Sequence, residues 1–356
     1  MASGFCRLVF FRHGLSQIHL NLGNFRDVRY SLRMMIRTNN EPMQGKQITL
    51  IGGGGFLGRY LTTILAKKGA QLRIVSRHPN KTAHLRCLGE PGQIVPMFGD
   101  ICIPQSLVSA IHGVDGVINL SGIPSETPLH TFEATYASGP GQLADMVTAQ
   151  QIPYYIHVSS LGVPLPGAPD AVQAYAHAKQ RGERAVQKAC PRAIIVRPNL
   201  LFGPGDGLFT AYAQMMQLLP MLPLFGGGCA PMAPVHAEDV AEAISRLLFN
   251  DLIQDKSITL SGPKQTHFKD ILLLMMLFMR RSPRLLSLPQ RLSSVLGKCH
   301  GFVPHFPFTP LQTILLGQTW AASASASQIG FDRLGIFPMP LEESFPSYLS
   351  PFRKYA

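Results

Sequence analysis

The chain has 356 residues, of which 46% are apolar and only 15% are charged, so it can bury a sizeable core and is not a small disulfide-stapled scaffold. Its formal net charge of +12 favours anionic partners such as a phosphorylated cofactor or lipid head groups. The basic residues are scattered and do not alternate with aromatic residues, so the sequence does not indicate a nucleic-acid-binding surface. The six cysteines lack metal-ligand spacing, and no metal site is expected.

The first 42 residues differ from the rest of the chain. They contain six arginines, no lysine and only two acidic residues. This charge pattern is typical of a mitochondrial transit segment, although serine is scarce. A mis-assigned upstream start, with the protein beginning at Met35 or Met43, is the alternative. In either case residues 1–42 are an N-terminal extension outside the predicted fold.

From Gln47 onward, short apolar runs alternate with helix-length segments, which predicts βαβ units and a parallel sheet. The predicted strands before residue 200 are 48–51, 72–76, 93–97, 116–120, 154–158 and 193–196. Six strands suffice for a doubly wound, Rossmann-type α/β sheet, so we assign residues 43–200 to a dinucleotide-binding domain.

After Pro198 the residue pattern changes: proline and glycine cluster, and the strand and helix patterns become irregular. We expect residues 201–356 to form a smaller, irregular α+β region for substrate or partner contacts. The elements predicted there are helices at 238–249 and near 267–279 and a strand at 257–261.

A glycine-rich turn follows the first predicted strand. Gly52, Gly55 and Gly58 lie at the points where a backbone must leave a strand, pass close to a pyrophosphate and start a helix. Phe56 and Leu57 lie between the last two of these glycines, and the helix that follows would present free N–H groups to the phosphates. These five residues are the predicted phosphate-binding turn, with a flexible glycine turn as the alternative.

The residues after the second and third strands indicate which dinucleotide is bound. An NAD(H) site usually has Asp or Glu after the second strand, whereas this chain has Arg77 there. Arg77 can meet a 2′-phosphate with a forked, charged contact, so we predict NADP(H) over NAD(H), with a solvated surface arginine as the alternative. Asp100, after the third strand, is expected either to contact the adenine amino group or to cap the helix that begins at Pro104.

A second set of polar residues lies near the fifth strand. Tyr175 and Lys179 are four residues apart in a predicted helix and therefore share one face. An ammonium beside a phenol favours the phenolate, which makes Tyr175 usable as a general acid or base, and Lys179 can also bind the nicotinamide ribose. Ser160 ends the preceding strand and could polarise a substrate oxygen. A purely structural helix is the alternative.

Taken together, these motifs resemble the extended and atypical short-chain dehydrogenase/reductases over roughly residues 46–265. Within that superfamily the chain is most similar to the subfamily of the NADPH-binding accessory subunit, alpha-subcomplex subunit nine, of respiratory complex I and its alphaproteobacterial homologues. The resemblance is carried by Gly52-x-x-Gly55-x-x-Gly58, Gly99-Asp100, Asn119-Leu120-Ser121-Gly122, Tyr175-x-x-x-Lys179, Arg197-Pro198 and Val235-His236.

The resemblance implies an NADPH that is mainly structural, with Asn119 among the cofactor-binding residues. It also implies complex I subunits as partners and a peripheral position on the inner membrane, on the mitochondrial matrix side or the bacterial cytoplasmic side. An anionic lipid surface is a further expected partner. The longest apolar run, 271–279, is too short for a membrane span and suits either a partner surface or a buried core helix.

Ser160 departs from the pattern of that subfamily and completes a Ser160, Tyr175 and Lys179 set. The second hypothesis is therefore a free NADPH-dependent reductase, epimerase or dehydratase acting on a hydroxyl or carbonyl substrate. In that case Tyr175 would exchange the proton, and the region 203–234 would form a substrate lid.

Overall fold

The structure, a computed structural model, describes residues 43–160, 170–250, 256–289 and 329–354. The predicted N-terminal extension therefore lies outside the described residues. Within the described part, no helix has both the length and the apolar character needed to cross a bilayer.

The larger part of the molecule is a sheet of seven strands in the order β11-β6-β5-β4-β1-β2-β3, with every neighbouring pair parallel. The prediction of a doubly wound parallel sheet is confirmed. The strand order reverses between β1 and β4, and ligands of such sheets bind at the carboxyl ends of the strands at that point. The strands are β1 (Gln47–Ile51), β2 (Gln71–Ser76), β3 (Ile94–Phe98), β4 (Gly116–Asn119), β5 (Tyr154–Val158), β6 (Ile194–Pro198) and β11 (Ser257–Leu260).

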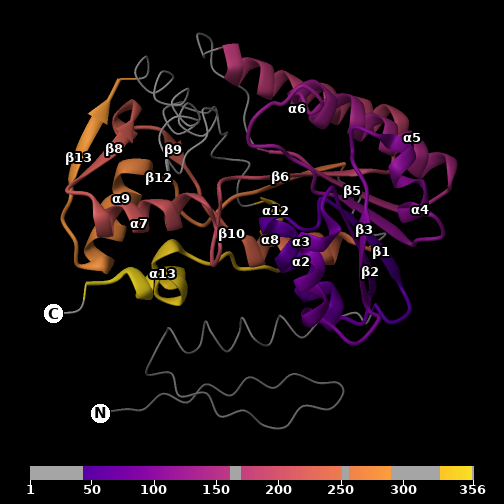
Figure 1. Cartoon of the computed structure of the whole chain (residues 1–356), viewed down its shortest axis with the longest axis horizontal. Helices are drawn as coiled ribbons and strands as arrows, with labels where there is room; N and C mark the ends of the chain where they lie inside the picture. The colour runs from indigo at the N-terminus through magenta and orange to yellow at the C-terminus, as the bar shows by residue number, and fades with distance from the viewer. Residues whose placement is uncertain (1–42, 161–169, 251–255, 290–328, 355–356) are drawn as a thin grey trace, which may run out of the picture.

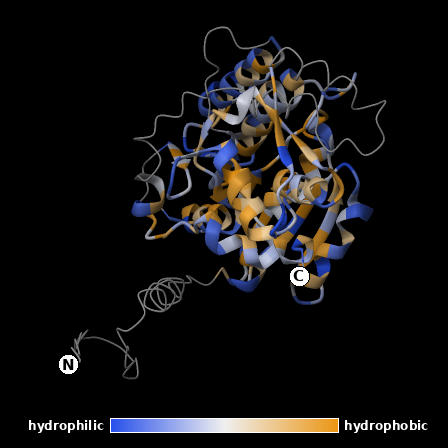
Figure 2. Ribbon diagram, turned by 90° about the vertical axis from the view of Figure 1, so that its left-hand side faces the viewer, coloured by the Kyte–Doolittle hydropathy of each residue, from blue (hydrophilic) through white to orange (hydrophobic). Residues whose placement is uncertain are grey.

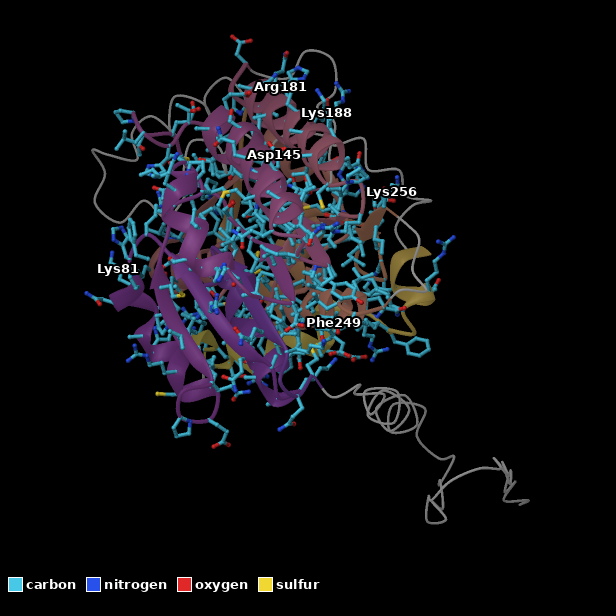
Figure 3. All side chains as sticks on the ribbon, turned by 90° about the vertical axis from the view of Figure 1, so that its right-hand side faces the viewer. Lys81, Asp145, Arg181, Lys188, Phe249 and Lys256 are labelled. Carbon is cyan, nitrogen blue, oxygen red and sulfur yellow. The ribbon has the colours of Figure 1, made fainter. Side chains whose placement is uncertain are left out.

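Helices cover both faces of this sheet (Figure 1). One face carries α2 (Phe56–Lys67) and α8 (Ala237–Leu247), and the other carries α5 (Gly139–Ala149) and α6 (Asp170–Ala189). The strands are apolar on both sides for this reason, with Ile48 packing toward α2 and Ile51 toward α5. Figure 3 shows Arg181 and Lys188 of α6 at the outer surface of their layer. Two short helices, α3 (Pro79–Thr82) and α4 (Val108–Ile111), complete the connections.

A second lobe with its own core lies beside the sheet (Figure 1). Its aromatic core residues include Phe209, Tyr212, Phe225 and Phe268. Its helices are α7 (Leu208–Leu218), α9 (Phe268–Met279) and α13 (Leu341–Leu349). Its longer strands, β8 (Met221–Phe225) and β13 (Arg284–Leu288), pair with each other. Two short pairs complete it: β7 (Leu201–Phe202) with β10 (Val235–His236), and β9 (Pro231–Met232) with β12 (Thr266–His267).

The predicted helices near 238–249 and 267–279 are α8 and α9, and the predicted strand at 257–261 is β11. Both α8 and β11 return to the dinucleotide-binding sheet although they follow residue 200 in the chain. A domain boundary at residue 200 stays a prediction, and these two elements cross it.

The C-terminal segment joins the two cores. It includes α12 (Ile329–Arg333), and Phe331 and Ile336 are buried in the core shared by α2 and α8. Phe345, on α13, is buried in the core of the second lobe. Between these anchors the N–H of Met339 donates to the Asp239 carboxylate at 2.6 Å. One segment thus stabilises both parts of the fold.

A nearly buried ion pair fastens the end of α2 to α8. The Lys68 ammonium donates to Ser245 Oγ at 2.7 Å and lies 3.5 Å from Glu242 Oε2. The side chains of Lys68 and Glu242 are only 5% and 12% exposed. Glu242 also accepts from Arg246 Nε at 2.7 Å, so both cations contact the same carboxylate.

We expect Glu242→Gln to lower the free energy of unfolding by about 3 kcal/mol, because the nearly buried Lys68 ammonium loses the carboxylate charge of Glu242 beside it. The measurement is the urea midpoint of unfolding. Glu133→Gln is the matched control, since the pair of Glu133 with Arg181 is about half exposed and should contribute little. Equal midpoints for the two variants would contradict this account of the α2–α8 contact.

Candidate dinucleotide-binding site

The glycine turn between β1 and α2 is built by backbone contacts that exclude side chains. Gly52 has a φ of +74°, and a Cβ there would lie 2.9 Å from Ser121 Cα. A Cβ at Gly58 would lie only 2.1 Å from the carbonyl oxygen of Gly53. At Gly55, by contrast, the nearest atom would be Gly52 O at 3.3 Å. Gly52 and Gly58 are therefore required because a side chain at either position would collide with neighbouring backbone atoms. Gly55 has room for a side chain, and its lack of one would let a ligand approach the backbone closely.

Helix α2 begins at Phe56 with free donors directed out of its first turn. Its N-cap residue, Gly55, has no side chain to cap the helix, and the first turn contains no acidic residue. The first N–H groups of an α-helix, here including those of Phe56 and Leu57, have no acceptor within the helix. Such a terminus suits a pyrophosphate. The assignment of Gly52, Gly55, Phe56, Leu57 and Gly58 to phosphate binding stays a prediction.

The residues predicted for the adenosine end of the site include an exposed cation and a buried acid. Arg77 follows β2 and is exposed, whereas Asp100 follows β3 and is only 6% exposed. Asp100 Oδ1 accepts from the N–H of Cys102 at 3.0 Å, and Oδ2 lies 2.7 Å from His130 Nε2. Burial alone would raise the pKa of Asp100, but the bonds from His130 and Cys102 and the charge of Arg77 together hold it below its usual value.

The ligand atoms of Asp100, Cys102 and His130 all lie within 4.8 Å of one another. Two ligands on one tetrahedral zinc ion would be about 3.3 Å apart, given metal–ligand distances near 2 Å. The 2.7 Å separation between His130 and Asp100 is therefore that of a hydrogen bond. The cluster therefore ties the turn after β3 to the loop that carries His130.

Asn119 ends β4 and is fully buried. Its Oδ1 accepts from the N–H and the hydroxyl of Ser121 at 3.0 and 2.6 Å. Its Nδ2 lies 3.1 Å from His157 Nδ1. These bonds fix the turn after β4 at the place where Gly52 passes closest to it.

The structure brings together the three residues predicted for catalysis. Ser160 Oγ lies 3.4 Å from the Tyr175 hydroxyl. Lys179 Nζ lies 5.8 Å from the centroid of the Tyr175 ring and 4.3 Å from that of Tyr136. Phe132 and Tyr136 hold the Tyr175 ring through edge contacts at 5.7 and 5.3 Å. The arrangement could polarise an oxygen and exchange a proton with it.

Three further residues contact the predicted site residues without having been predicted from the sequence: His130, Tyr136 and His157. The Tyr136 hydroxyl bonds the backbone of Ile123 in both directions, accepting at 2.8 Å and donating at 2.7 Å. These contacts form between a loop and residues 13 or more positions away in the chain, and no motif of the sequence marks them.

The family model described as NAD dependent epimerase/dehydratase family matches residues 48–258. That span contains the phosphate-binding turn, all seven sheet strands apart from the ends of β1 and β11, and the Ser160, Tyr175 and Lys179 set. The chain therefore belongs to the NAD dependent epimerase/dehydratase family, and its fold is an NAD(P)-binding fold.

Among its relatives is the Arabidopsis thaliana protein named NADH dehydrogenase (ubiquinone) 1 alpha subcomplex subunit 9, mitochondrial. The two are 31% identical over 323 residues, which cover 88% of this chain and 79% of that protein. The resemblance indicated by the motifs is confirmed. The ceramide reductase of Caulobacter vibrioides is 30% identical over 194 residues, covering 54% of this chain and 58% of that enzyme.

Among solved structures, the UDP-glucuronic acid 4-epimerase of Bacillus cereus, in complex with UDP-glucuronic acid and NAD, has a TM-score of 0.65 at 19% identity. The match covers 86% of this chain and 98% of that one. At this identity the likeness concerns the fold, and it agrees with the doubly wound sheet and the adjoining second lobe.

Proposed function

We propose that this chain is an NADP(H)-binding accessory subunit of respiratory complex I, in which the cofactor is mainly structural. The observation that carries the proposal is the similarity to the Arabidopsis subunit over 88% of the chain, which is too long to be confined to the dinucleotide-binding sheet. The proposed location is peripheral on the inner membrane, on the matrix side in a mitochondrion or the cytoplasmic side in a bacterium.

The surface of the second lobe supports an interface with an anionic membrane surface. Helix α9 buries Ile271 and Met275 in the core, but Leu277 on the same helix is 78% exposed. Leu218, at the end of α7, is 81% exposed. Figure 2, which colours the ribbon by hydropathy, shows many apolar residues among the elements of the protein on this side. Arg280 follows α9 and is exposed, so positive charge adjoins apolar side chains, as anionic lipid requires.

The test is purification of the chain from its own host membranes in mild detergent, with mass spectrometry of the released nucleotide and of the co-purifying proteins. We expect NADPH or NADP⁺ together with respiratory-chain subunits. A monomer that never co-migrates with those subunits and does not bind vesicles of anionic lipid would exclude the accessory-subunit function.

Within this proposal the cofactor is NADP(H), because the end of β2 carries Arg77 where an NAD(H) site usually carries a carboxylate. We expect Arg77→Gln to weaken NADPH binding by roughly 10- to 100-fold, as expected from the loss of one charge-assisted contact. NADH binding should change little, since NADH has no 2′-phosphate. Titration calorimetry with both nucleotides measures the two constants. An equal loss for NADPH and NADH would refute the 2′-phosphate contact.

A second function is favoured by one specific observation, the convergence of Ser160 and Tyr175 at 3.4 Å with Lys179 on the same helix face as Tyr175. This is the arrangement that an NADPH-dependent reductase, epimerase or dehydratase needs for a hydroxyl or carbonyl substrate. The similarity to ceramide reductase supports the reductase form of this alternative. In that case the region 203–234 would serve as the substrate lid.

Tyr175→Phe separates the two functions. It removes only the hydroxyl, so NADPH should remain bound. If the cofactor is structural, the variant should keep normal cofactor content and normal growth of the host. If the chain is an enzyme, the variant should lose at least about 100-fold in turnover, as expected for loss of a general acid or base. The measurements are bound nucleotide per chain and growth on a respiratory substrate.

A further inference from the structure

Helix α5 is preceded by a π-helical turn, Ala134–Ser138. The N–H of Gly139 donates to the carbonyl oxygen of Ala134, so this turn holds one residue more than a turn of α-helix. Such turns are rare and occur often at functional sites. Its middle residue is Tyr136, which is only 6% exposed. The proposed cofactor chemistry assigns no role to this tyrosine.

The π-helical turn packs against α6 at a contact that only glycine allows. A side chain at Gly182 would collide with the carbonyl oxygen of Tyr136, and its Cβ would also lie 3.3 Å from Ala137 Cα. Gly182 and Lys179 are three residues apart and therefore share one face of α6. The glycine thus brings the face of α6 that carries Lys179 against the turn that carries Tyr136.

The ring of Tyr136 contacts the ammonium of Lys179. Lys179 Nζ lies 4.3 Å from the ring centroid, within the distance at which the face of an aromatic ring attracts a cation. The centroid of the Tyr175 ring is farther from the same nitrogen, at 5.8 Å. Among the residues that the structure describes, no carboxylate lies within ion-pair distance of Lys179. The ring face of Tyr136 thus takes the place of a counter-ion for this half-buried side chain.

The hydroxyl of Tyr136 fixes the ring in this position. It accepts from the N–H of Ile123 and donates to the carbonyl oxygen of the same residue, so it is committed to the loop after β4. Burial, in the first place, raises the pKa of Tyr136 well above its usual range, so the phenol stays neutral. Tyr136 is therefore not suited to exchange a proton, and its ring and hydroxyl have separate structural tasks.

We propose that Tyr136 is a positioning residue for Lys179: its ring face holds the ammonium beside Tyr175, while its hydroxyl holds the ring against the loop after β4. Tyr136 would act on the cofactor only through Lys179, the residue predicted to bind the nicotinamide ribose. The effect on the cofactor rests on the proposed NADP(H) site, whereas the contact between Lys179 and Tyr136 does not.

The first test is nuclear magnetic resonance of the full chain labelled with ¹³C-lysine, with Lys179→Arg used to assign the resonance. We expect the ε-methylene protons of Lys179 to be shifted upfield by the ring current of Tyr136 and to show cross-relaxation with its ring protons. A Lys179 resonance at the ordinary position of a solvated lysine, without that cross-relaxation, would overturn the proposal. This measurement uses the unaltered protein and does not depend on whether a variant folds.

The second test compares Tyr136→Phe, which keeps the ring, with Tyr136→Leu, which removes it. We expect Tyr136→Phe to lower the urea midpoint, because the bonds to Ile123 are lost, but to keep the upfield Lys179 signal and the affinity for NADPH. Tyr136→Leu should lose most of the upfield shift and raise the dissociation constant of NADPH roughly 5- to 10-fold, the loss expected for one partly buried cation–π contact.

Tyr212→Leu is the matched control, since Tyr212 is a fully buried tyrosine in the core of the second lobe. It should lower the urea midpoint and leave both the Lys179 signal and the affinity for NADPH unchanged. A purely structural Tyr136 would behave like this control. A folded Tyr136→Leu chain with an unchanged Lys179 signal and unchanged affinity would therefore refute the positioning role.

The two levels of the proposal fail separately. If the unaltered chain binds neither NADPH nor NADH, the proposed function fails, and the resonance measurement on the free protein still decides the contact between Lys179 and Tyr136. If the unaltered chain binds NADPH and Tyr136→Leu binds it equally well, the proposed function stands and the positioning role fails.

Discussion

The constraint on which the fold depends is the close crossing of the turn after β1 and the first turn of α2. The carbonyl oxygen of Gly53 occupies the space that a Cβ of residue 58 would need, at 2.1 Å from its position. Any side chain at residue 58 would collide with that oxygen, so the crossing requires glycine there. It sets the angle at which α2 leaves the sheet and places the N–H groups of its first turn beside the carboxyl end of β1.

Helix α2 is connected to the rest of the protein at both of its ends. At its beginning, Tyr60 donates to Pro204 O at 2.9 Å and Arg59 Nη2 donates to Gly205 O at 3.2 Å. These carbonyls belong to the loop that leads into the second lobe, where Asp206 accepts the N–H of Phe209 at 2.6 Å at the start of α7. At its end, the pair of Lys68 with Glu242 joins α2 to α8. A shift of α2 would therefore disturb contacts with the second lobe and with α8.

The sheet was predictable from the sequence because parallel strands buried on both faces are short apolar runs, and all six predicted strands formed. The glycine turn was predictable for a related reason, since only glycine meets the steric demands at residues 52 and 58. The second lobe was predicted as irregular, yet Leu208–Leu218 is the regular helix α7. Its buried Phe209, Tyr212 and Met216 have helical spacing, but the prolines and glycines on either side obscured that pattern.

The polar details of the site were not predictable in the same way. His130 reaches Asp100 across 30 positions of the chain, and His157 faces Asn119 across 38. Each pair depends on strand register and on a loop conformation that local sequence does not encode. The spacing of Tyr175 and Lys179 on one helix, in contrast, is local, and the prediction that they share a face needed only the helix itself.

The connections of α2 show how the proposed dinucleotide would act if its role is structural. A pyrophosphate at the N-terminus of α2 would stabilise the same helix that holds the loop into the second lobe, less than two turns away. A ligand that binds only the folded state at a hundred times its dissociation constant adds about 2.7 kcal/mol of stability. That is a large share of the stability of an ordinary domain. Cofactor binding would therefore be retained even without turnover, and an intact Ser160, Tyr175 and Lys179 set is compatible with either role.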